Sequence, residues 1–120
     1  MTNTERITNY YSGFEKKEWD AVEKLLGDEF TFTSPNGDDH LDMQAFKAKC
    51  WPQSVWVKRF EVESVIEEGS EIFVKYLCHT NYGRSFRNTE YFKLADGKIK
   101  TIECYFGGSQ GYPSQHAPDL

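Results

Sequence analysis

The stretch that decides the fold runs from Arg84 to Gly107 and reads RSFRNTEYFKLADGKIKTIECYFG. Two segments with alternating apolar and polar residues flank the pair Asp96-Gly97. An Asp-Gly pair between two such segments is typical of a two-residue type I′ turn. The stretch therefore predicts a β-hairpin with its turn at Asp96-Gly97.

Counting outward from that turn predicts which side chains share one face of the hairpin, because strand side chains alternate. The facing pairs are Ala95–Lys98, Leu94–Ile99, Phe92–Thr101, Glu90–Glu103 and Asn88–Tyr105. This face is apolar near the turn and carries two carboxylates side by side further along. Like charges directly opposite each other destabilise a sheet, so Glu90 and Glu103 mark the first candidate functional site.

Composition predicts one domain with one core, since the chain has 120 residues. Aromatic residues make up 16% of the chain. They bury large areas and commonly line small-molecule pockets. The sequence is therefore compatible with an aromatic core that also encloses a pocket.

Charge and hydropathy argue against several partner classes. The net charge is −5 and no cluster of Lys or Arg stands out, which disfavours nucleic acids and anionic membranes. No apolar run approaches the ~18 residues of a membrane span. The polar start, Met-Thr-Asn-Thr-Glu-Arg, argues against a secretory signal. We therefore expect a cytoplasmic protein.

The cysteines and histidines show no spacing typical of disulfides or of a metal site. They are Cys50, Cys78, Cys104, His40, His79 and His116. We expect reduced thiols, no metal and no organic cofactor.

The first third of the chain predicts two helices. Thr2 and Glu5 fit a capping box, and apolar residues at helical spacing extend the first helix from about Asn3 to Lys17. A second, short helix begins near Trp19, and Gly27 can terminate it.

The next segment predicts a short strand, a loop and a third helix. Phe30–Thr33 alternates as a strand, and Ser34–His40 is rich in turn-forming residues. Asp42 can cap a helix that ends before Pro52.

From Trp56 onward the pattern predicts an antiparallel meander with turns near Gly69 and Gly83. The register across Gly83 has two alternatives. A three-residue loop sets Tyr76 and Cys78 beside Glu90 and Asn88, whereas a two-residue loop sets Leu77 and His79 there. The first is preferred because it gives the more apolar face.

Helices that precede strands in this way indicate an α+β fold, with N-terminal helices packed on a strongly curved, mostly antiparallel sheet. The expected domain covers residues 1–108. Residues 109–120 lack periodicity and are expected to form a tail, mobile or packed on a partner subunit.

The order of elements resembles the nuclear transport factor 2-like superfamily, and most closely its SnoaL-like branch of small bacterial proteins. The motifs that carry the resemblance are Phe32-Thr33-Ser34-Pro35, Asp38-Asp39-His40, Cys50-Trp51-Pro52, Phe86-Arg87-Asn88-Thr89-Glu90, Asp96-Gly97-Lys98-Ile99 and Glu103-x-Tyr105-Phe106-Gly107. Each is weak alone, and together in order they are fairly specific.

The resemblance implies a cone-shaped roll with a pocket at its open end, and a homodimer that packs through the outer sheet face. The superfamily includes ketosteroid isomerases, polyketide cyclases, dehydratases and ligand-binding members, so the fold does not deliver a function. In the isomerases a tyrosine of the first helix and two aspartates carry the chemistry. Tyr10 or Tyr11 fits the tyrosine, but Glu90 and Glu103 do not fit the aspartates, and that mechanism is not transferred.

Four residues are predicted to be catalytic: Glu90, Glu103, Asp39 and His40. Two carboxylates in contact inside a pocket cannot both be charged, so one would hold a proton and act as an acid beside a base. Alternatively both carboxylates lie at the rim in water or bind Lys75, Arg84 or Arg87.

The second candidate is the pair Asp39-His40. A histidine beside a carboxylate can act as a base near neutral pH. Alternatively, the Asp38-Asp39-His40 loop is a turn without a catalytic role.

The predicted ligand-binding residues are aromatic or amide side chains expected in the cone: Tyr11, Phe14, Phe32, Trp51, Tyr76, Asn88, Phe92 and Tyr105. For the three tyrosines the alternative is an ordinary core role with the hydroxyl satisfied, which fits Tyr105 less well, and Trp51 fits a core or dimer contact better. Two hypotheses follow: a cofactor-free acid–base enzyme acting on a small carbonyl or hydroxyl compound, or a non-catalytic ligand-binding or sensing homodimer.

Overall fold

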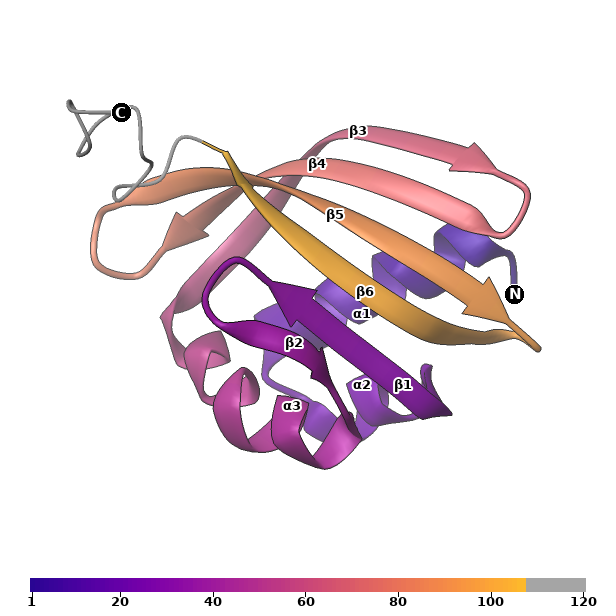
Figure 1. The fold of residues 1–120 in the computed structure, drawn as a ribbon. Coiled ribbons are helices and arrows are strands. Elements are labelled where there is room, and N and C mark those ends of the chain that lie inside the picture. The colour runs from indigo at the N-terminus through magenta and orange to yellow at the C-terminus, as the bar shows by residue number, and fades with distance from the viewer. Residues whose placement is uncertain (108–120) are drawn as a thin grey trace, which may run out of the picture.

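The predicted hairpin is present in the computed structural model, which describes residues 1–107 (Figure 1). It joins β5 (Ser85–Ala95) to β6 (Lys98–Gly107). Asp96 and Gly97 both have positive φ, 54° and 73°, as a type I′ turn requires. The prediction of the turn is confirmed.

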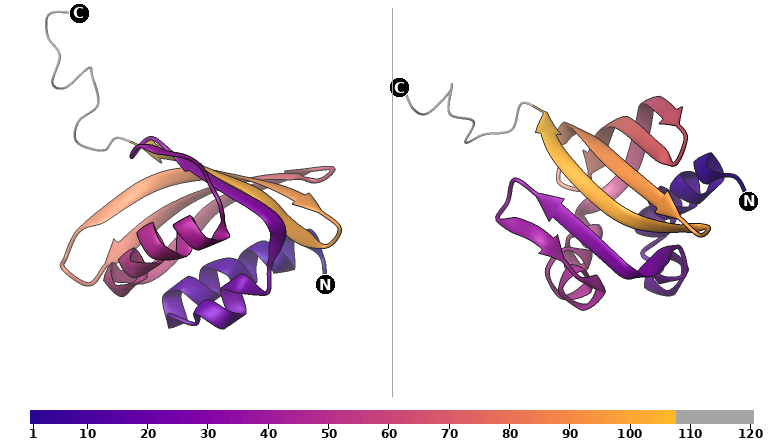
Figure 2. Two further views of the ribbon diagram at one scale, coloured as in Figure 1. Left: turned by 60° about the horizontal axis from the view of Figure 1, so that its bottom comes forward. Right: turned by 45° about the vertical axis from the view of Figure 1, so that its right-hand side comes forward.

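The fold is α+β, as predicted: the N-terminal helices lie on the concave side of a curved six-stranded sheet (Figure 2). The sheet order is β2-β1-β6-β5-β4-β3, and within it only β1 and β6 pair in parallel. Before the hairpin the chain forms α1 (Asn3–Lys16), α2 (Trp19–Glu23), β1 (Leu26–Ser34), β2 (Asp38–Leu41), α3 (Met43–Lys49), a 3₁₀ helix (Trp51–Trp56), β3 (Val57–Glu68) and β4 (Glu71–Thr80).

The helix caps form as the sequence predicts. In α1 the Glu5 amide donates to the Thr2 hydroxyl at 3.1 Å, and the Thr2 amide donates to the Glu5 carboxylate at 2.9 Å. In α3 the Ala45 amide donates to Asp42 at 2.9 Å. These bonds satisfy amides that have no partner within the helix.

The core lies between the helices and the concave sheet face, and aromatic rings fill much of it. Tyr10 and Tyr11 of α1 pack edge-on against Phe92 of β5, with ring centroids 5.6 and 5.9 Å apart. Phe46 of α3 packs against Phe30 and Phe32 of β1. Offset and edge-on packing is the favoured arrangement for such rings.

Two local predictions are wrong in the first half of the chain. The second helix ends at Glu23, and Gly27 belongs to β1 instead of capping the helix. Pairing of Leu26 with Ile99 of β6 draws this segment into the sheet. The segment Asp38–Leu41 forms β2, paired with β1, where a loop was expected.

The predicted register of the hairpin is also wrong beyond its first pairs. Leu94 pairs with Ile99, but Lys93 pairs with Thr101, so Lys100 is an extra residue in a β-bulge. Ile99 and Ile102 are three residues apart and both fully buried, which strict alternation cannot achieve. Burial of both isoleucines explains why the bulge forms.

Across Gly83 the preferred face is confirmed but the preferred register is not. Tyr76 and Cys78 share the inner face with Asn88 and Glu90, and Tyr76 pairs with Asn88. The strands are therefore displaced by two residues from the expected register. A two-residue displacement preserves the face, because strand side chains alternate with period two.

Within the described residues, no helix has the length and apolar character needed to cross a membrane. The predicted tail, residues 109–120, lies outside the described residues.

Candidate functional site

A cavity of about 200 Å³ opens between the helices and the concave face of the sheet. Much of its wall is aromatic, with contributions from Tyr10, Tyr11, Phe14, Phe32, Phe46 and Phe60. Pockets for drug-sized ligands usually measure about 300–1,000 Å³. The size and lining of this cavity therefore suit a small, largely apolar compound.

Glu90 is a buried carboxylate in the wall of this cavity. It lies on β5 and is 6% exposed. The Tyr11 hydroxyl of α1 donates a hydrogen bond to its Oε1 at 2.8 Å. Among residues 1–107, no Lys, Arg or His side chain forms an ion pair with it. Glu90 is thus a carboxylate stabilised by hydrogen bonds alone.

Burial raises the pKa of Glu90 to about 7. Removal from water penalises the charged form, while hydrogen bonds from Tyr11 and Cys104 oppose that shift in part. Near neutral pH the side chain is therefore present in both protonation states. A group with this property can accept or donate a proton during catalysis.

Further hydrogen-bonding groups surround Glu90. Asn88 donates to the Tyr76 hydroxyl oxygen at 3.1 Å, and the Tyr76 and Tyr11 rings lie 5.4 Å apart. Burial, and then the nearby Glu90, hold the pKa values of Tyr10, Tyr11 and Tyr76 well above their usual range. These hydroxyls are therefore hydrogen-bond donors at neutral pH.

A second buried carboxylate, Asp38 of β2, lies in the wall of the same cavity, three strands away from Glu90 in the sheet order. It is 5% exposed. The Ser34 hydroxyl donates to its Oδ2 at 2.7 Å, and the Lys49 ammonium of α3 forms an ion pair with its Oδ1. Unlike Glu90, Asp38 therefore has a cation beside it.

Glu103 and Tyr105 do not lie in the cavity. The bulge at Lys100 turns both to the outer sheet face, where the Tyr105 hydroxyl donates to Glu103 at 2.7 Å. Tyr105 is 51% exposed. The prediction that Glu103 faces Glu90 and shares a proton with it is wrong, because Cys104 is the residue opposite Glu90.

Asp39 and His40 lie on edge strand β2 and do not line the cavity. Their side chains contact each other at 2.7 Å and are largely exposed. His40 has a positive φ of 51°. The structure therefore brings neither residue together with Glu90.

Of the predicted ligand-binding residues, five line the cavity: Tyr11, Phe14, Phe32, Tyr76 and Asn88. Phe92 is fully buried beneath the tyrosines of α1. Trp51 packs between Phe14 and Trp19, with ring centroids 4.8 and 5.2 Å away. Trp51 therefore fits the alternative of a core role, and Phe92, predicted to bind ligand, is a core residue outside the cavity wall.

All three cysteines line the cavity, and Asp38 and Ser34 line it too, although sequence reasoning assigned none of them to a site. Burial raises the pKa values of Cys50 and Cys78 to about 11, and that of Cys104 still higher. The thiols are therefore protonated and weakly nucleophilic. The spacing of Ile99 and Ile102 was the available signal that Cys104 turns inward.

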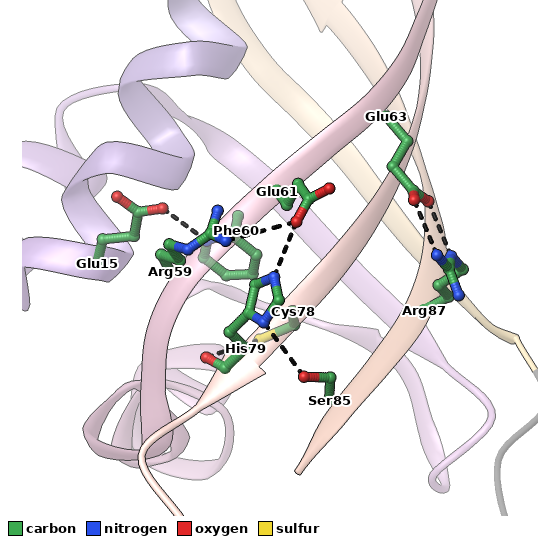
Figure 3. A network of polar contacts seen from close by, with 9 residues as sticks. All are labelled: Glu15, Arg59, Phe60, Glu61, Glu63, Cys78, His79, Ser85 and Arg87. Carbon is green, nitrogen blue, oxygen red and sulfur yellow. Dashed lines mark hydrogen bonds and ion pairs between the residues drawn. The ribbon is translucent and has the colours of Figure 1, made fainter. Parts of the chain in front are cut away.

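The outer face of the same strands carries a separate polar network (Figure 3). His79 lies between Glu61 and Ser85, at 2.9 and 3.2 Å. Arg87 donates two hydrogen bonds to Glu63, at 2.9 and 3.0 Å. The hydrogen bonds from Arg87 hold the pKa of Glu63 below its usual value.

Within residues 1–107, no group of three or more His, Cys, Asp or Glu side chains is arranged to hold a metal ion.

Comparison with known proteins gives a family and a fold. The family model of the SnoaL-like domain matches residues 7–102. No curated protein matches the chain. An NTF2-like protein of unknown function from Cytophaga hutchinsonii superposes with a TM-score of 0.76 at 20% identity, covering 96% of this chain and 94% of that one. IdmH from Streptomyces antibioticus, a candidate polyketide cyclase, gives 0.71 at 16% identity, with 87% and 91% covered. A candidate polyketide cyclase from Sinorhizobium meliloti gives 0.71 at 16% identity, with 83% and 93% covered.

Proposed function

Because the chain belongs to the SnoaL-like domain family, we propose that its cavity binds a small, largely apolar carbonyl compound and that Glu90 moves a proton on it. One observation carries the proposal: Glu90 is buried in the cavity wall, is held by Tyr11 and has no cationic partner among residues 1–107. The description of two structural neighbours as candidate polyketide cyclases agrees with carbonyl chemistry.

The proposed chemistry begins with proton abstraction. Deprotonated Glu90 takes a proton from the carbon next to the carbonyl. The electrons of that C–H bond form the carbon–carbon double bond of an enolate, and the carbonyl π electrons move to oxygen. The oxygen of the Tyr76 hydroxyl accepts a hydrogen bond from Asn88. Its hydrogen can therefore be donated to the enolate oxygen of the substrate. Return of the proton to another carbon would give isomerisation, and attack of the enolate on a second carbonyl would give cyclisation.

The experiment follows exchange of α-protons in deuterium oxide by NMR, with acetophenone and benzoylacetone as probes. We expect the protein to accelerate exchange, with a rate that rises with pH to a plateau and a midpoint near pH 7, where Glu90 deprotonates. Glu90→Gln should lower the rate by at least about 100-fold, the usual contribution of a general base.

Glu103→Gln is the matched control, because it makes the same change on the outer face. It should leave the rate within about two-fold. Equal rates for Glu90→Gln and wild type would eliminate the proposed role of Glu90. Binding of the probes without any exchange would support the alternative, a non-catalytic ligand-binding module.

We also infer a homodimer that forms through the outer sheet face. The exposed apolar side chains Ile66, Phe73 and Tyr105 on β3, β4 and β6 support it, since exposed apolar groups of this kind often mark an interface. Light scattering should give twice the mass of the chain for wild type and a monomer for Phe73→Glu. A monomeric wild type would overturn the inference.

A further inference from the structure

Four inward-facing polar side chains form a row across four neighbouring strands. Ser34 of β1 pairs with Asp38 of β2, and Glu90 of β5 pairs with Cys104 of β6. Thr33 pairs with Glu103, so the following residues, Ser34 and Cys104, are neighbours across β1 and β6. All four side chains line the cavity. The row therefore begins with one carboxylate and ends with the other.

The two carboxylates are too far apart to act on the same atom. Neighbouring strands lie ~4.8 Å apart, so three spacings separate the backbones of Asp38 and Glu90 by about 14 Å along the sheet. The concave curvature brings the side chains closer, and the small residues Ser34 and Cys104 leave room between them. A single compound can therefore lie along the row with one end at each carboxylate.

The chemistry of the Asp38 end favours a neutral hydrogen-bond donor. A carboxylate has about four lone-pair directions, and in Asp38 the Ser34 hydroxyl and the Lys49 ammonium occupy two of them. Lys49 covers the buried Oδ1, so the remaining lone-pair direction is the one on Oδ2 that the Ser34 hydroxyl does not use. Because Lys49 already balances the charge, a hydroxyl group fits this end better than a second cation.

We propose that the ligand carries a hydroxyl group at the end opposite its reacting carbonyl, and that Asp38 accepts a hydrogen bond from it. This assignment rests on the proposed function, which places the carbonyl end at Glu90. It narrows the substrate class to small hydroxylated carbonyl compounds with an apolar body, such as phenolic ketones. Asp38 then selects the substrate and orients it, while Glu90 acts on it.

The test compares two probes of nearly equal size, para-hydroxyacetophenone and para-methylacetophenone, of which only the first has a hydroxyl hydrogen to donate. Dissociation constants come from NMR titration and rates from α-proton exchange. Wild type should bind the hydroxy compound at least about ten-fold more tightly, since a buried carboxylate rejects an analogue that cannot donate to it. Asp38→Asn and Asp38→Ala should reduce that preference to less than about two-fold.

Glu90→Gln separates this inference from the proposed function. It should abolish exchange but keep the preference for the hydroxy compound. Exchange with no preference in wild type would overturn the role of Asp38 and leave that of Glu90 intact. If wild type prefers the hydroxy compound but does not accelerate α-proton exchange, the role of Asp38 would be supported and the proposed catalysis overturned. Equal weakening of both probes by the Asp38 variants would show a purely structural role and would also overturn the inference.

Discussion

Glu90 and Glu63 are the same residue type on the two faces of one sheet, and their surroundings are opposite. Glu90 points under α1 into the cavity, accepts a hydrogen bond from Tyr11, and has its pKa raised by burial. Glu63 lies on the outer side, where Arg87 donates two hydrogen bonds and holds its pKa down. The difference shows that packing, more than residue type, decides which carboxylate of this sheet can exchange a proton near neutral pH.

The largest expected contrast between the two faces is in stability. Phe92 is fully buried, whereas Ile66 on the outer side is 62% exposed. Phe92→Ala should lower the free energy of unfolding by about 3–5 kcal/mol, because it leaves a cavity in the core. In the monomeric Phe73→Glu background, where no partner covers the outer face, Ile66→Ala should change it by no more than about 0.5 kcal/mol. Urea denaturation measures both, and similar losses would contradict the assignment of the faces.

The second contrast is in the pH dependence of stability. The pKa of Glu90 is about 7 in the folded protein and 4.5 when exposed. Between these pH values the folded state binds more protons than the unfolded state, so the contribution of Glu90 to stability is lost as pH rises from about 4.5 to 7. The loss amounts to about 3 kcal/mol.

Glu90→Gln removes this titration. Between pH 4 and pH 8, the free energy of unfolding of the variant should therefore rise by about 3 kcal/mol relative to that of wild type. Unfolding followed at a series of pH values checks this. A constant difference between the two proteins would mean that the pKa of Glu90 is not raised.

A third prediction sharpens the role of Tyr11. Tyr11→Phe removes the hydroxyl that donates to charged Glu90, so it should raise the pKa of Glu90 further. The midpoint of the exchange profile should move to higher pH, and the rate at pH 7 should fall about ten-fold, since a hydrogen bond to a charged group contributes about 1.5–3 kcal/mol. Tyr105→Phe, which removes a hydroxyl from the outer face, is the control and should leave the profile unchanged. A profile that Tyr11→Phe does not shift would contradict this role.

The smallest effect is expected on the outer face. Arg87→Ala breaks a two-hydrogen-bond contact with Glu63 that is exposed to water and screened by salt. In the monomeric Phe73→Glu background, the midpoint of urea denaturation should stay within experimental error, although NMR titration should show the pKa of Glu63 rising. A clear loss of stability in that background would contradict the prediction, whereas a loss in wild type alone would mean that the proposed dimer interface covers this network.

Much of the fold could be predicted because its signals are local. The Asp96-Gly97 turn, the capping box of Thr2 and Glu5, and the cap at Asp42 depend on residues a few positions apart. The inner face of β4 was also predicted, because alternation of apolar residues reports burial directly. Within the candidate site, this reasoning placed Glu90, Tyr76 and Asn88 on the inner face correctly.

The rest depended on contacts between distant segments. Strict alternation placed Glu103 and Tyr105 inside, but the bulge at Lys100 exchanged them for Cys104. Asp38 was assigned to a turn, and only its pairing with β1 and its contact with Lys49 place it in the cavity wall. Gly27 was predicted to cap a helix because it follows a short helical pattern. Its place in β1 depends on the pairing of β1 with β6, which leaves no local pattern in the sequence.

The sequence by itself determined the hairpin turn, the helix starts, the α+β order and the presence of a glutamate at position 90. Only the tertiary structure decided which carboxylates meet the cavity and in what protonation state. The physical reason is that one extra residue in a strand reverses every following side chain, and that a pKa responds to burial under α1, which the neighbours of Glu90 in sequence do not specify.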